Sequence, residues 1–282
     1  MKCLILGSSG QIGSALTTYL RNQNEEVIEY DIVRSPKEDL RLFPNPLLES
    51  LISTSDFVFF LAFDVGGSVY LKTYQHSYEF IANNTKIMHG TFEILRKFKK
   101  PFIFASSQMA TMSHSPYGVL KALGDYYTRS LGGLIVKFWN VYGVEHDLNK
   151  SHVITDFILK AMKHGKIDML TTGMEERQFL YSEDACRALH ILSKKYITIS
   201  RDESLHITNF EWTSILDVAK IIANHFPETK VVAAKEKDSV QLSQRNEPDP
   251  TMRKYWEPRI GLEQGIEKIV AYYANLIEQR TL

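Results

Sequence analysis

The sequence predicts an α/β protein built on a doubly wound parallel sheet, with a smaller C-terminal lobe. Short apolar runs alternate with longer stretches of helical periodicity in the first half of the chain, and such alternation is typical of a parallel sheet with helices on both faces. A glycine-rich turn follows the first apolar run, and the regular alternation ends at Gly143. A chain of 282 residues lies at the upper end of what one core supports, so one large or two unequal domains are expected.

The short apolar runs are interpreted as strands, and much of the chain between them as helix. The first strand, the first helix and the second strand form a βαβ unit around the glycine turn. The strands are expected at residues 2–6, 26–32, 57–62, 102–105 and 134–138. The helices with the clearest periodicity are expected at residues 12–20, 81–98 and 117–130.

The chain after Gly143 is interpreted as a second, smaller lobe with returns to the sheet domain. Its expected elements are helices at residues 154–164, 215–225 and 262–277, a strand at 205–208, and an irregular stretch rich in proline and charge at 247–258. We therefore predict a sheet domain at residues 1–143 with returning segments near 177–209, and a second lobe at residues 144–176 and 210–282.

The charge balance and the cysteines argue against several classes of function. Lys plus Arg equal Asp plus Glu at 33 each, so no overall field favours nucleic acid or an anionic membrane, and neither is expected as a partner. No segment offers 18 uncharged apolar residues, and the first apolar run is too short for a signal peptide. Cys3 and Cys186 lack the spacing of a metal or redox site. A cytoplasmic protein without a metal site is the expectation.

The turn after the first strand has the glycine spacing of a dinucleotide-binding site. Glycines permit a tight turn there and let backbone N–H groups approach a pyrophosphate at the start of the next helix. Alone, this spacing is a weak signal, because glycine turns between strands and helices are common. The residues of the turn expected to contact the cofactor are Gly7, Gly10, Gln11, Ile12 and Gly13.

Asp31 ends the second strand roughly twenty residues further on, at the position of a ribose-binding acid. Its carboxylate can accept hydrogen bonds from the adenosine ribose and would repel a 2′-phosphate, so NAD is favoured over NADP. Arg34 is the nearby cation that leaves NADP as an alternative. A solvated strand-end acid is the other interpretation of Asp31. Asp39 and Leu40 are expected at the adenine, with a simple loop acid as an equally weighted alternative.

Tyr117 and Lys121 lie four residues apart at the start of a predicted helix and therefore share one face. A nearby ammonium favours phenolate, so we expect the pKa of Tyr117 to be lowered and the tyrosine to act as a base toward a substrate hydroxyl. Ser107, which follows the strand at 102–105, is expected to hold the same oxygen. A surface packing pair is the alternative. The predicted chemistry is oxidation of a hydroxyl-bearing carbon by NAD.

With these residues together, the chain resembles the extended short-chain dehydrogenase/reductase superfamily, and within it the NAD-dependent epimerase/dehydratase family that modifies nucleotide sugars. The resemblance covers nearly the whole length. Besides the glycine turn and the Tyr117–Lys121 pair, it rests on residues 61–68, 83–84, 140–143 and 177–184.

The resemblance implies a nucleotide-diphosphate sugar as partner and assigns roles to residues outside the first two motifs. Arginine suits a diphosphate because its planar fork binds phosphate oxygens bidentately, and of two candidate arginines near the C-terminal end Arg245 is expected to clamp it. The positions implied at the cofactor are Leu61 and Ala62. The positions implied at the substrate are Gly67, Ser68, Asn140, Arg177, Arg245 and, as the alternative clamp, Arg253.

Residues 64–68 and 151–153 look closest to the subgroup of GDP-mannose 3,5-epimerase and GDP-fucose synthase. That likeness implies an acid/base role for His152, with capping or packing of the following helix as the alternative. Met109 stands where the subgroup carries an acid/base cysteine, and it cannot exchange a proton. Gln108 and Met109 also stand where dehydratases of the family carry an acid, so a 4,6-dehydratase is not expected.

The predicted function is epimerisation of a nucleotide sugar through oxidation at C4 by bound NAD and reduction on the other face. A C4 reductase or dehydrogenase and a 3,5-epimerase of the same family are enzymatic alternatives, and a non-catalytic, NAD-sensing Rossmann protein is a third. The helices at 81–98 and 117–130 lie where the family pairs subunits, so the resemblance implies a homodimer. The alternative is that the apolar faces of these helices only cover the sheet. Pocket shape decides the sugar and the nucleotide, so no motif predicts them.

Overall fold

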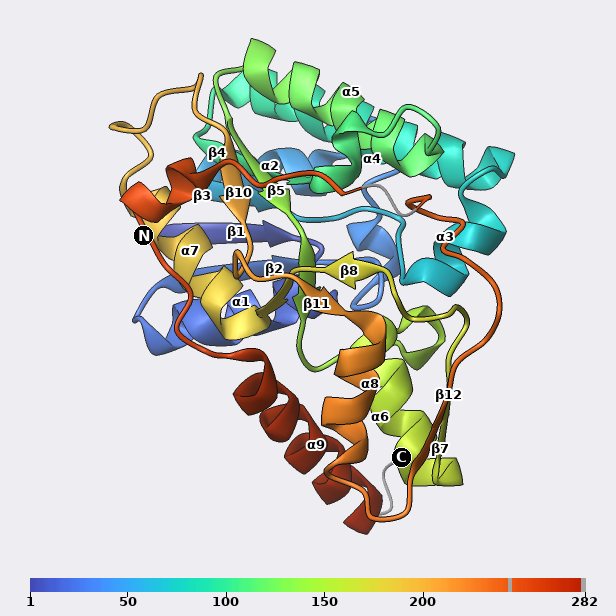
Figure 1. Cartoon of the computed structure of the whole chain (residues 1–282). Coiled ribbons are helices and arrows are strands. Elements are labelled where there is room, and N and C mark those ends of the chain that lie inside the picture. Colours follow the sequence, from blue (N-terminus) through green and yellow to red (C-terminus); the bar gives the residue numbers. More distant parts are fainter. Residues whose placement is uncertain (243–244, 280–282) are drawn as a thin grey trace.

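The computed structural model describes residues 1–242 and 245–279, and its main feature is a six-stranded parallel sheet. The strands follow the spatial order β10-β5-β4-β3-β1-β2 (Figure 1). The predicted Rossmann-type, doubly wound fold class is confirmed. The strand bounds are β1 Lys2–Leu6, β2 Glu26–Tyr30, β3 Phe57–Phe60, β4 Phe102–Ser107, β5 Leu134–Phe138 and β10 Leu205–Ile207.

The central strands are buried on both faces of the sheet. In β1, Cys3 and Ile5 belong to one core cluster, whereas Leu4 and Leu6 belong to another. Successive side chains of a strand point to opposite faces, so a strand covered on both sides is apolar at every position, as the run FVFF of β3 shows. This explains why the sequence shows continuous apolar runs here and no alternation with polar residues.

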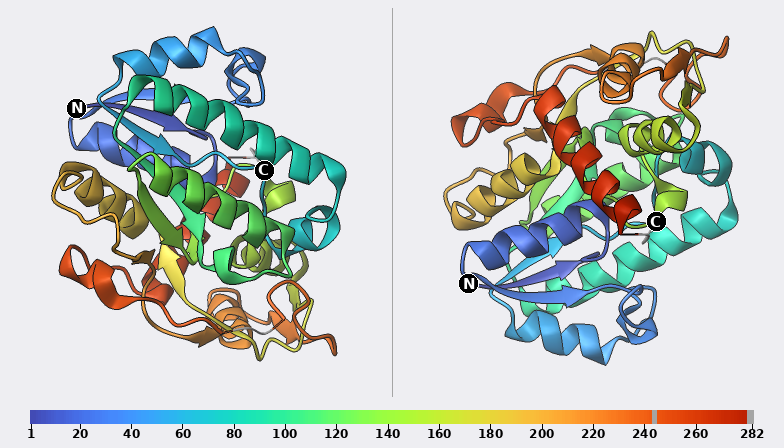
Figure 2. Two further views of the ribbon diagram at one scale, coloured as in Figure 1. Left: turned by 90° about the horizontal axis from the view of Figure 1, so that it is seen from above. Right: turned by 90° about the horizontal axis from the view of Figure 1, so that it is seen from below.

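Helices cover both faces, as a doubly wound fold requires. α1 and α7 pack against the cluster that contains Cys3, and α2, α4 and α5 pack against the cluster that contains Leu4 (Figures 1 and 2). Side chains that accept a hydrogen bond from a first-turn N–H begin α2, α4 and α5; they are Asn45, Ser77 and Ser115. The helix bounds are α1 Gln11–Asn22, α2 Pro46–Thr54, α4 Tyr78–Phe98, α5 Pro116–Ser130 and α7 Ser182–Lys194.

A third core cluster lies away from the sheet, and α6, α8 and α9 contribute to it (Figure 1). The division of the chain into two lobes stays a prediction. Met252 and Trp256, which belong to the predicted second lobe, pack in the core cluster of the sheet that contains Cys3. The bounds are α6 Val153–His164, α8 Ile215–Ala223 and α9 Leu262–Glu278, with the strand pairs β7 Lys166–Asp168 and β12 Lys230–Val232, β6 Asn140–Tyr142 and β9 Phe179–Tyr181, and β8 Glu176–Arg177 and β11 Thr213–Ser214.

Several predicted boundaries differ from the structure by about two residues. The second and third strands end at Tyr30 and Phe60, two residues before their predicted ends. The second strand ends early because residues 32–34 form a turn. In the described part of the chain, no helix combines the length and apolar character needed to cross a membrane. Short elements that the patterns did not indicate are α3 Ser68–Tyr74 and the 3₁₀ turns η1 Pro36–Glu38, η2 Gln108–Thr111, η3 Leu148–Lys150 and η4 Pro250–Lys254.

Candidate active site

A cleft of about 670 Å³ runs along the carboxyl ends of the strands. The strand order reverses between β1 and β3, and in open α/β sheets ligands bind in the crevice beside such a reversal. Most of the residues singled out from the sequence line this cleft, although their roles stay predictions. They are Gly7, Gly10, Gln11, Ile12, Gly13, Asp31, Asp39, Leu40, Leu61, Ala62, Gly67, Ser68, Ser107, Tyr117, Lys121, Asn140 and His152.

The turn between β1 and α1 requires glycine at two positions. Gly7 has a φ of +88°, and a Cβ there would lie 2.7 Å from the backbone nitrogen of Ala62. A Cβ on Gly13 would lie 2.0 Å from the Gly7 carbonyl oxygen, so α1 approaches the turn as closely as its backbone allows. The helix N-terminus that results lines the cleft and carries no side chain at Gly10 or Gly13, which fits the pyrophosphate of a dinucleotide.

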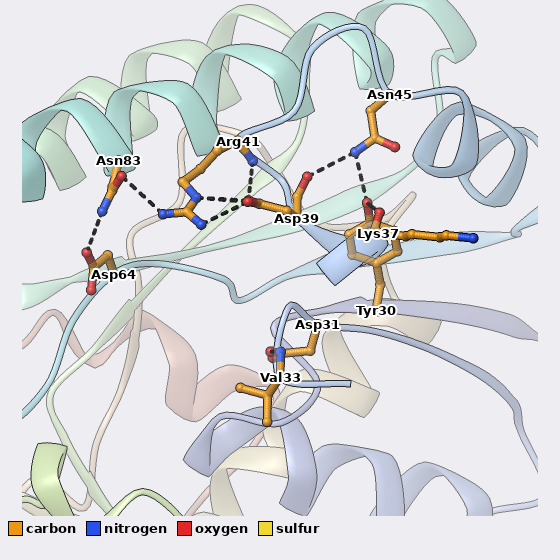
Figure 3. A network of polar contacts seen from close by, with 9 residues as sticks. All are labelled: Tyr30, Asp31, Val33, Lys37, Asp39, Arg41, Asn45, Asp64 and Asn83. Carbon is orange, nitrogen blue, oxygen red and sulfur yellow. Dashed lines mark hydrogen bonds and ion pairs between the residues drawn. The ribbon is translucent and has the colours of Figure 1, made fainter. Parts of the chain in front are cut away.

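Asp31 follows β2 and faces the same turn. Its Oδ2 accepts the Ser9 backbone N–H at 2.9 Å. Its Oδ1 accepts the backbone N–H of Val33 at 2.9 Å (Figure 3). Arg34, the cation that leaves NADP as an alternative, is paired with Glu29 at 3.0 Å and with Glu38 at 3.7 Å. The two backbone N–H groups fix the carboxylate beside the turn, and the nearby cation is already paired with acids. The ribose-binding role of Asp31 stays a prediction.

A chain of polar contacts extends from Asp39 along the cleft (Figure 3). Arg41 donates to both carboxylate oxygens of Asp39, and these hydrogen bonds hold the pKa of Asp39 below its usual value despite partial burial. The Nη1 of Arg41 donates to the Asn83 Oδ1 at 3.3 Å, and the Asn83 Nδ2 donates to the Asp64 Oδ2 at 3.1 Å. An acid that already accepts a bidentate arginine has fewer lone pairs left for an adenine amine, so Asp39 serves at least to orient Arg41.

Asp64 is the far end of this chain of contacts. Its Oδ1 accepts the Tyr70 hydroxyl at 2.6 Å and the Lys150 ammonium at 3.2 Å. Burial alone would raise the pKa of Asp64, but the hydrogen bonds from Tyr70 and Asn83 and the charge of Lys150 outweigh it and lower the pKa. Arg41 and Lys150 carried no motif in the sequence, since the contacts that place them in this chain, with Asn83 and with Asp64, join residues far apart along the sequence.

Ser107, Tyr117 and Lys121 meet where β4 ends and α5 begins. Ser115 caps α5 by accepting the Gly118 N–H at 3.2 Å, and a Cβ on Gly118 would lie 2.3 Å from the Met109 carbonyl oxygen, so the helix starts directly against the residues that follow Ser107. This close packing brings the three predicted residues to one wall of the cleft.

The expectation that Lys121 lowers the pKa of Tyr117 is wrong for the isolated chain. Burial raises the pKa of Tyr117 to about 12, against a smaller opposite effect of a hydrogen bond with Ser107. The Lys121 Nζ donates to the Ala105 carbonyl at 2.6 Å and lies 3.8 Å from the centre of the Phe63 ring, and burial lowers the pKa of Lys121 to about 7. An ammonium engaged in this way, and partly neutral near pH 7, does little to favour phenolate.

His152 precedes α6 and forms a close pair with Glu145. The His152 Nδ1 lies 2.6 Å from the Glu145 Oε1, and the backbone N–H of His152 donates to the Oε2 at 2.9 Å. Both residues line the cleft. Glu145 was not singled out from the sequence, where an acid in a loop after a strand carries no signal of its partner.

Met109 and Gln108, which follow Ser107, are both buried and both line the cleft. The Gln108 amide donates to the Gln241 Oε1 at 3.2 Å and accepts the Asn246 Nδ2 at 2.8 Å. Gln241 and Asn246 therefore pack directly on the short turn η2.

The predicted substrate arginines lie outside this cleft. Arg177 pairs with Asp238, and Arg245 pairs with Glu176 at 2.6 Å while stacking on Trp212 at 4.1 Å. Arg177 and Arg245 line a separate hollow of about 290 Å³. Arg253 lies in neither hollow and stacks on Phe210 at 4.5 Å. Asn140, by contrast, lines the main cleft, and its side chain donates to the Gln178 carbonyl at 3.3 Å.

The architecture is shared with solved structures of epimerases. An epimerase from Methanothermobacter thermautotrophicus has a TM-score of 0.86 at 20% identity, covering 99% of this chain and 93% of that one. A UDP-glucose 4-epimerase from Thermotoga maritima, solved with UDP-glucose, has a TM-score of 0.83 at 19% identity, covering 98% and 100%. At such identities the likeness shows the fold.

The model of the NAD dependent epimerase/dehydratase family matches residues 3–207, and the chain belongs to this family. The resemblance seen in the motifs is thus confirmed, together with the predicted class of enzyme and its NAD dependence.

Curated relatives include GDP-L-fucose synthase of Sinorhizobium fredii, 33% identical over 146 residues, which are 46% of this chain and 43% of that protein. UDP-glucuronic acid decarboxylase 1 of Danio rerio is 25% identical over 154 residues, which are 52% of this chain and 34% of that protein. The chain thus spans less than half the length of these relatives.

Proposed function

We propose that the protein is an NAD-dependent nucleotide-sugar epimerase that acts through oxidation at C4 of the sugar. The observation that supports this most is one cleft that contains both the glycine turn with Asp31 and the set Ser107, Tyr117 and Lys121. The turn that a Cβ on Gly7 or Gly13 would fill suits the cofactor, and the tyrosine set suits removal of a hydroxyl proton.

In the proposed reaction the chain binds the sugar hydroxyl and moves its proton. The Ser107 hydroxyl holds the C4 oxygen, and the Tyr117 oxygen takes the proton from it and later returns it. When bound, NAD accepts the two electrons of the oxidation, and its cationic ring is a charge of the kind that favours phenolate. Lys121 holds its place through the Ala105 carbonyl and the Phe63 ring.

A thermal-shift screen followed by product analysis tests the proposal. The probes are UDP-glucose, UDP-N-acetylglucosamine, dTDP-glucose and GDP-mannose, each with and without NAD. With NAD below the enzyme concentration, an epimerase converts many sugars per cofactor, whereas a reductase or dehydrogenase stops after one. Binding without any conversion would favour the non-catalytic, NAD-sensing alternative.

A 3,5-epimerase is the second candidate, because His152 lines the cleft as that subgroup would require. The buried Met109 argues against it, since inversion needs a second group that exchanges a proton. Incubation of enzyme, NAD and the converted sugar in D₂O separates the two. Deuterium at C3 or C5 that depends on His152 would favour the 3,5-epimerase.

For the substrate, we propose that Asn140, Gly67 and Ser68 contact the sugar end, because they line the main cleft. Arg177 and Arg245 would reach the diphosphate only if the ligand extends into the smaller hollow that they line. Their present partners, Asp238 and Glu176, would then compete with the phosphates.

We further propose that the protein is a homodimer paired through α4 and α5. The two helices lie side by side on one face of the sheet (Figure 2). Their outer surface exposes large apolar side chains, which water disfavours in a contiguous patch. These are Tyr78, Ile81, Val119, Leu123 and Tyr126.

A further inference from the structure

Glu145 and His152 form a polar pair in the cleft that the proposed oxidation does not use. The carboxylate of Glu145 accepts two donors from His152, its ring Nδ1 at 2.6 Å and its backbone N–H at 2.9 Å. The side chain of Glu145 is 6% exposed, whereas that of His152 is 42% exposed. The acid is thus buried beneath a ring whose other edge is open to the cleft.

The position of Glu145 is held from the smaller lobe. The Glu145 backbone N–H donates to the Tyr273 hydroxyl at 3.0 Å, and the same hydroxyl donates to the Glu145 carbonyl at 3.0 Å. Burial would raise the pKa of Glu145, but its interactions with His152, the side-chain hydrogen bond first among them, outweigh burial and lower the pKa. Glu145 is therefore ionised at neutral pH, and an ionised carboxylate only accepts hydrogen bonds.

We propose that Glu145 is a positioning residue that holds His152 with its ring proton on Nδ1, so that Nε2 accepts a hydrogen bond from a hydroxyl of the sugar. A neutral imidazole with a proton on one nitrogen has a lone pair on the other. Because the Oε1 of Glu145 requires a donor at Nδ1, the lone pair lies on Nε2, the open edge of the ring. The inference rests on the proposed function, since the hydroxyl belongs to its nucleotide-sugar substrate.

Other charged and titratable groups surround this end of the cleft, and the acids among them that are named here have partners of their own. Asp64 and Lys150 pair with each other at 3.2 Å, and the Asp147 carboxylate accepts the Asn149 N–H at 3.1 Å. His146 also lines the cleft. A purely structural alternative is that Glu145 only fastens the start of α6 through the His152 backbone. That alternative predicts a loss of stability without a change in the ring tautomer or in substrate affinity.

Glu145→Gln tests the positioning role directly, because an amide has one accepting atom where the carboxylate has two. The backbone N–H of His152 can only donate a hydrogen bond, so the amide oxygen of the variant side chain should face it. The NH₂ group of the amide should then face Nδ1. The ring proton is then expected to move to Nε2. Nitrogen-15 NMR of the histidine rings at about pH 9, where neutral imidazole dominates, should show Nδ1–H in the wild type and Nε2–H in the variant. The same tautomer in both proteins would overturn the proposal.

His152→Asn tests the contact with substrate, because its Nδ2 can still donate to Glu145 while nothing replaces Nε2. For the nucleotide sugar that the screen identifies, both variants should raise KM about 3- to 10-fold, the effect of one neutral hydrogen bond. The kcat should change by less than about twofold. An unchanged KM in both variants would overturn the substrate contact.

A matched control separates these effects from general destabilisation. Glu25 is likewise 6% exposed and accepts from His190 at 3.0 Å, but it lies outside the cleft. Glu25→Gln should therefore lower stability without raising KM. If no probe is turned over by the wild type, the proposed function fails, while the NMR comparison of wild type and Glu145→Gln still decides the positioning role.

Discussion

Burial acts in opposite directions on the two ionisable side chains of the tyrosine–lysine pair. It raises the pKa of Tyr117 to about 12 and lowers the pKa of Lys121 to about 7, because a poorly solvated environment disfavours charge on either group. Tyr117 needs positive charge close to its hydroxyl before it can accept a proton near neutral pH. The proposed site therefore depends on its cofactor for the basicity of the tyrosine as well as for the oxidation.

Tyr117→Phe removes one hydroxyl from the wall of the cleft. We expect the fold and NAD affinity to be kept and turnover of the nucleotide sugar to fall roughly 10²-fold or more, because the proton acceptor is lost. Steady-state kinetics measure the turnover of the nucleotide sugar. Calorimetric titration with NAD controls for cofactor affinity, and circular dichroism controls for the fold. Near-normal turnover would eliminate Tyr117 as the base.

Lys121 gives the stability of the protein a defined pH dependence. Its folded pKa of about 7 lies below its unfolded value of 10.5, so between these values the unfolded chain binds more protons and this group makes stability rise with pH. Against Lys121→Met, the wild type should gain up to about 1.4 kcal/mol per pH unit from pH 7 to 10. Urea unfolding of both proteins at each pH measures this difference, and parallel curves would contradict it.

Asp31 should make the protein bind NAD more tightly than NADP, because its carboxylate lies where a 2′-phosphate would add a like charge. Asp31→Asn keeps an oxygen for the Ser9 N–H and removes the charge, so the preference should narrow on the order of tenfold. Fluorescence titration with each reduced cofactor measures both affinities. Tighter NADP binding by the wild type would refute this role of Asp31.

Sequence patterns predicted those site residues that stand at a fixed spacing from a strand or a helix. Gly7, Asp31 and Tyr117 follow or begin regular elements at fixed spacings, so their common position at one edge of the sheet could be expected. Glu145 and Arg41 could not be singled out, because only the folded chain brings Glu145 onto the His152 ring and Arg41 onto Asn83 of α4.

At the scale of elements, most of the long helices and the central strands were predicted because burial on one face or on both leaves a clear period. The long helix α7 is the exception, since no bounds were predicted for it. α3 has only seven residues and α2 nine, so each shows too few turns for a period to emerge. The turn between β1 and α1 was predicted by composition, but its tight packing against Ala62 of the chain after β3 is a property of the assembled sheet.

Gly13→Ala tests how closely α1 must approach this turn. The new methyl group would lie 2.0 Å from the Gly7 carbonyl oxygen, so the turn or the helix must shift. We expect a loss of about 1–3 kcal/mol in the free energy of unfolding and at least tenfold weaker NAD binding. Gly261→Ala is the control, since nothing lies within 4 Å of its Cβ. Equal NAD affinity in both variants would contradict the proposed pyrophosphate site.

At the scale of the whole molecule, the two faces of the sheet differ in what lies outside them. The face covered by α1 and α7 also carries the segment with Met252 and Trp256, whereas α4 and α5 form an outer layer with exposed apolar side chains. Val119, Leu123 and Tyr126 are spaced so that they share one face of α5. A helix that only covers the sheet does not need a second, exposed apolar face.

Leu123→Glu tests whether that face pairs two copies of the chain. Leu123 is 40% exposed in the single chain, so a glutamate there should fold normally but would place two charges in the interface of a symmetric dimer. Light scattering coupled to size-exclusion chromatography should give twice the chain mass of 32.4 kDa for the wild type and a single chain for the variant. Ile197→Glu is the control, because Ile197 is 93% exposed and lies just after α7, away from this face. A wild type that runs as a single chain at micromolar concentration, or a variant that keeps the double mass, would contradict pairing through α4 and α5.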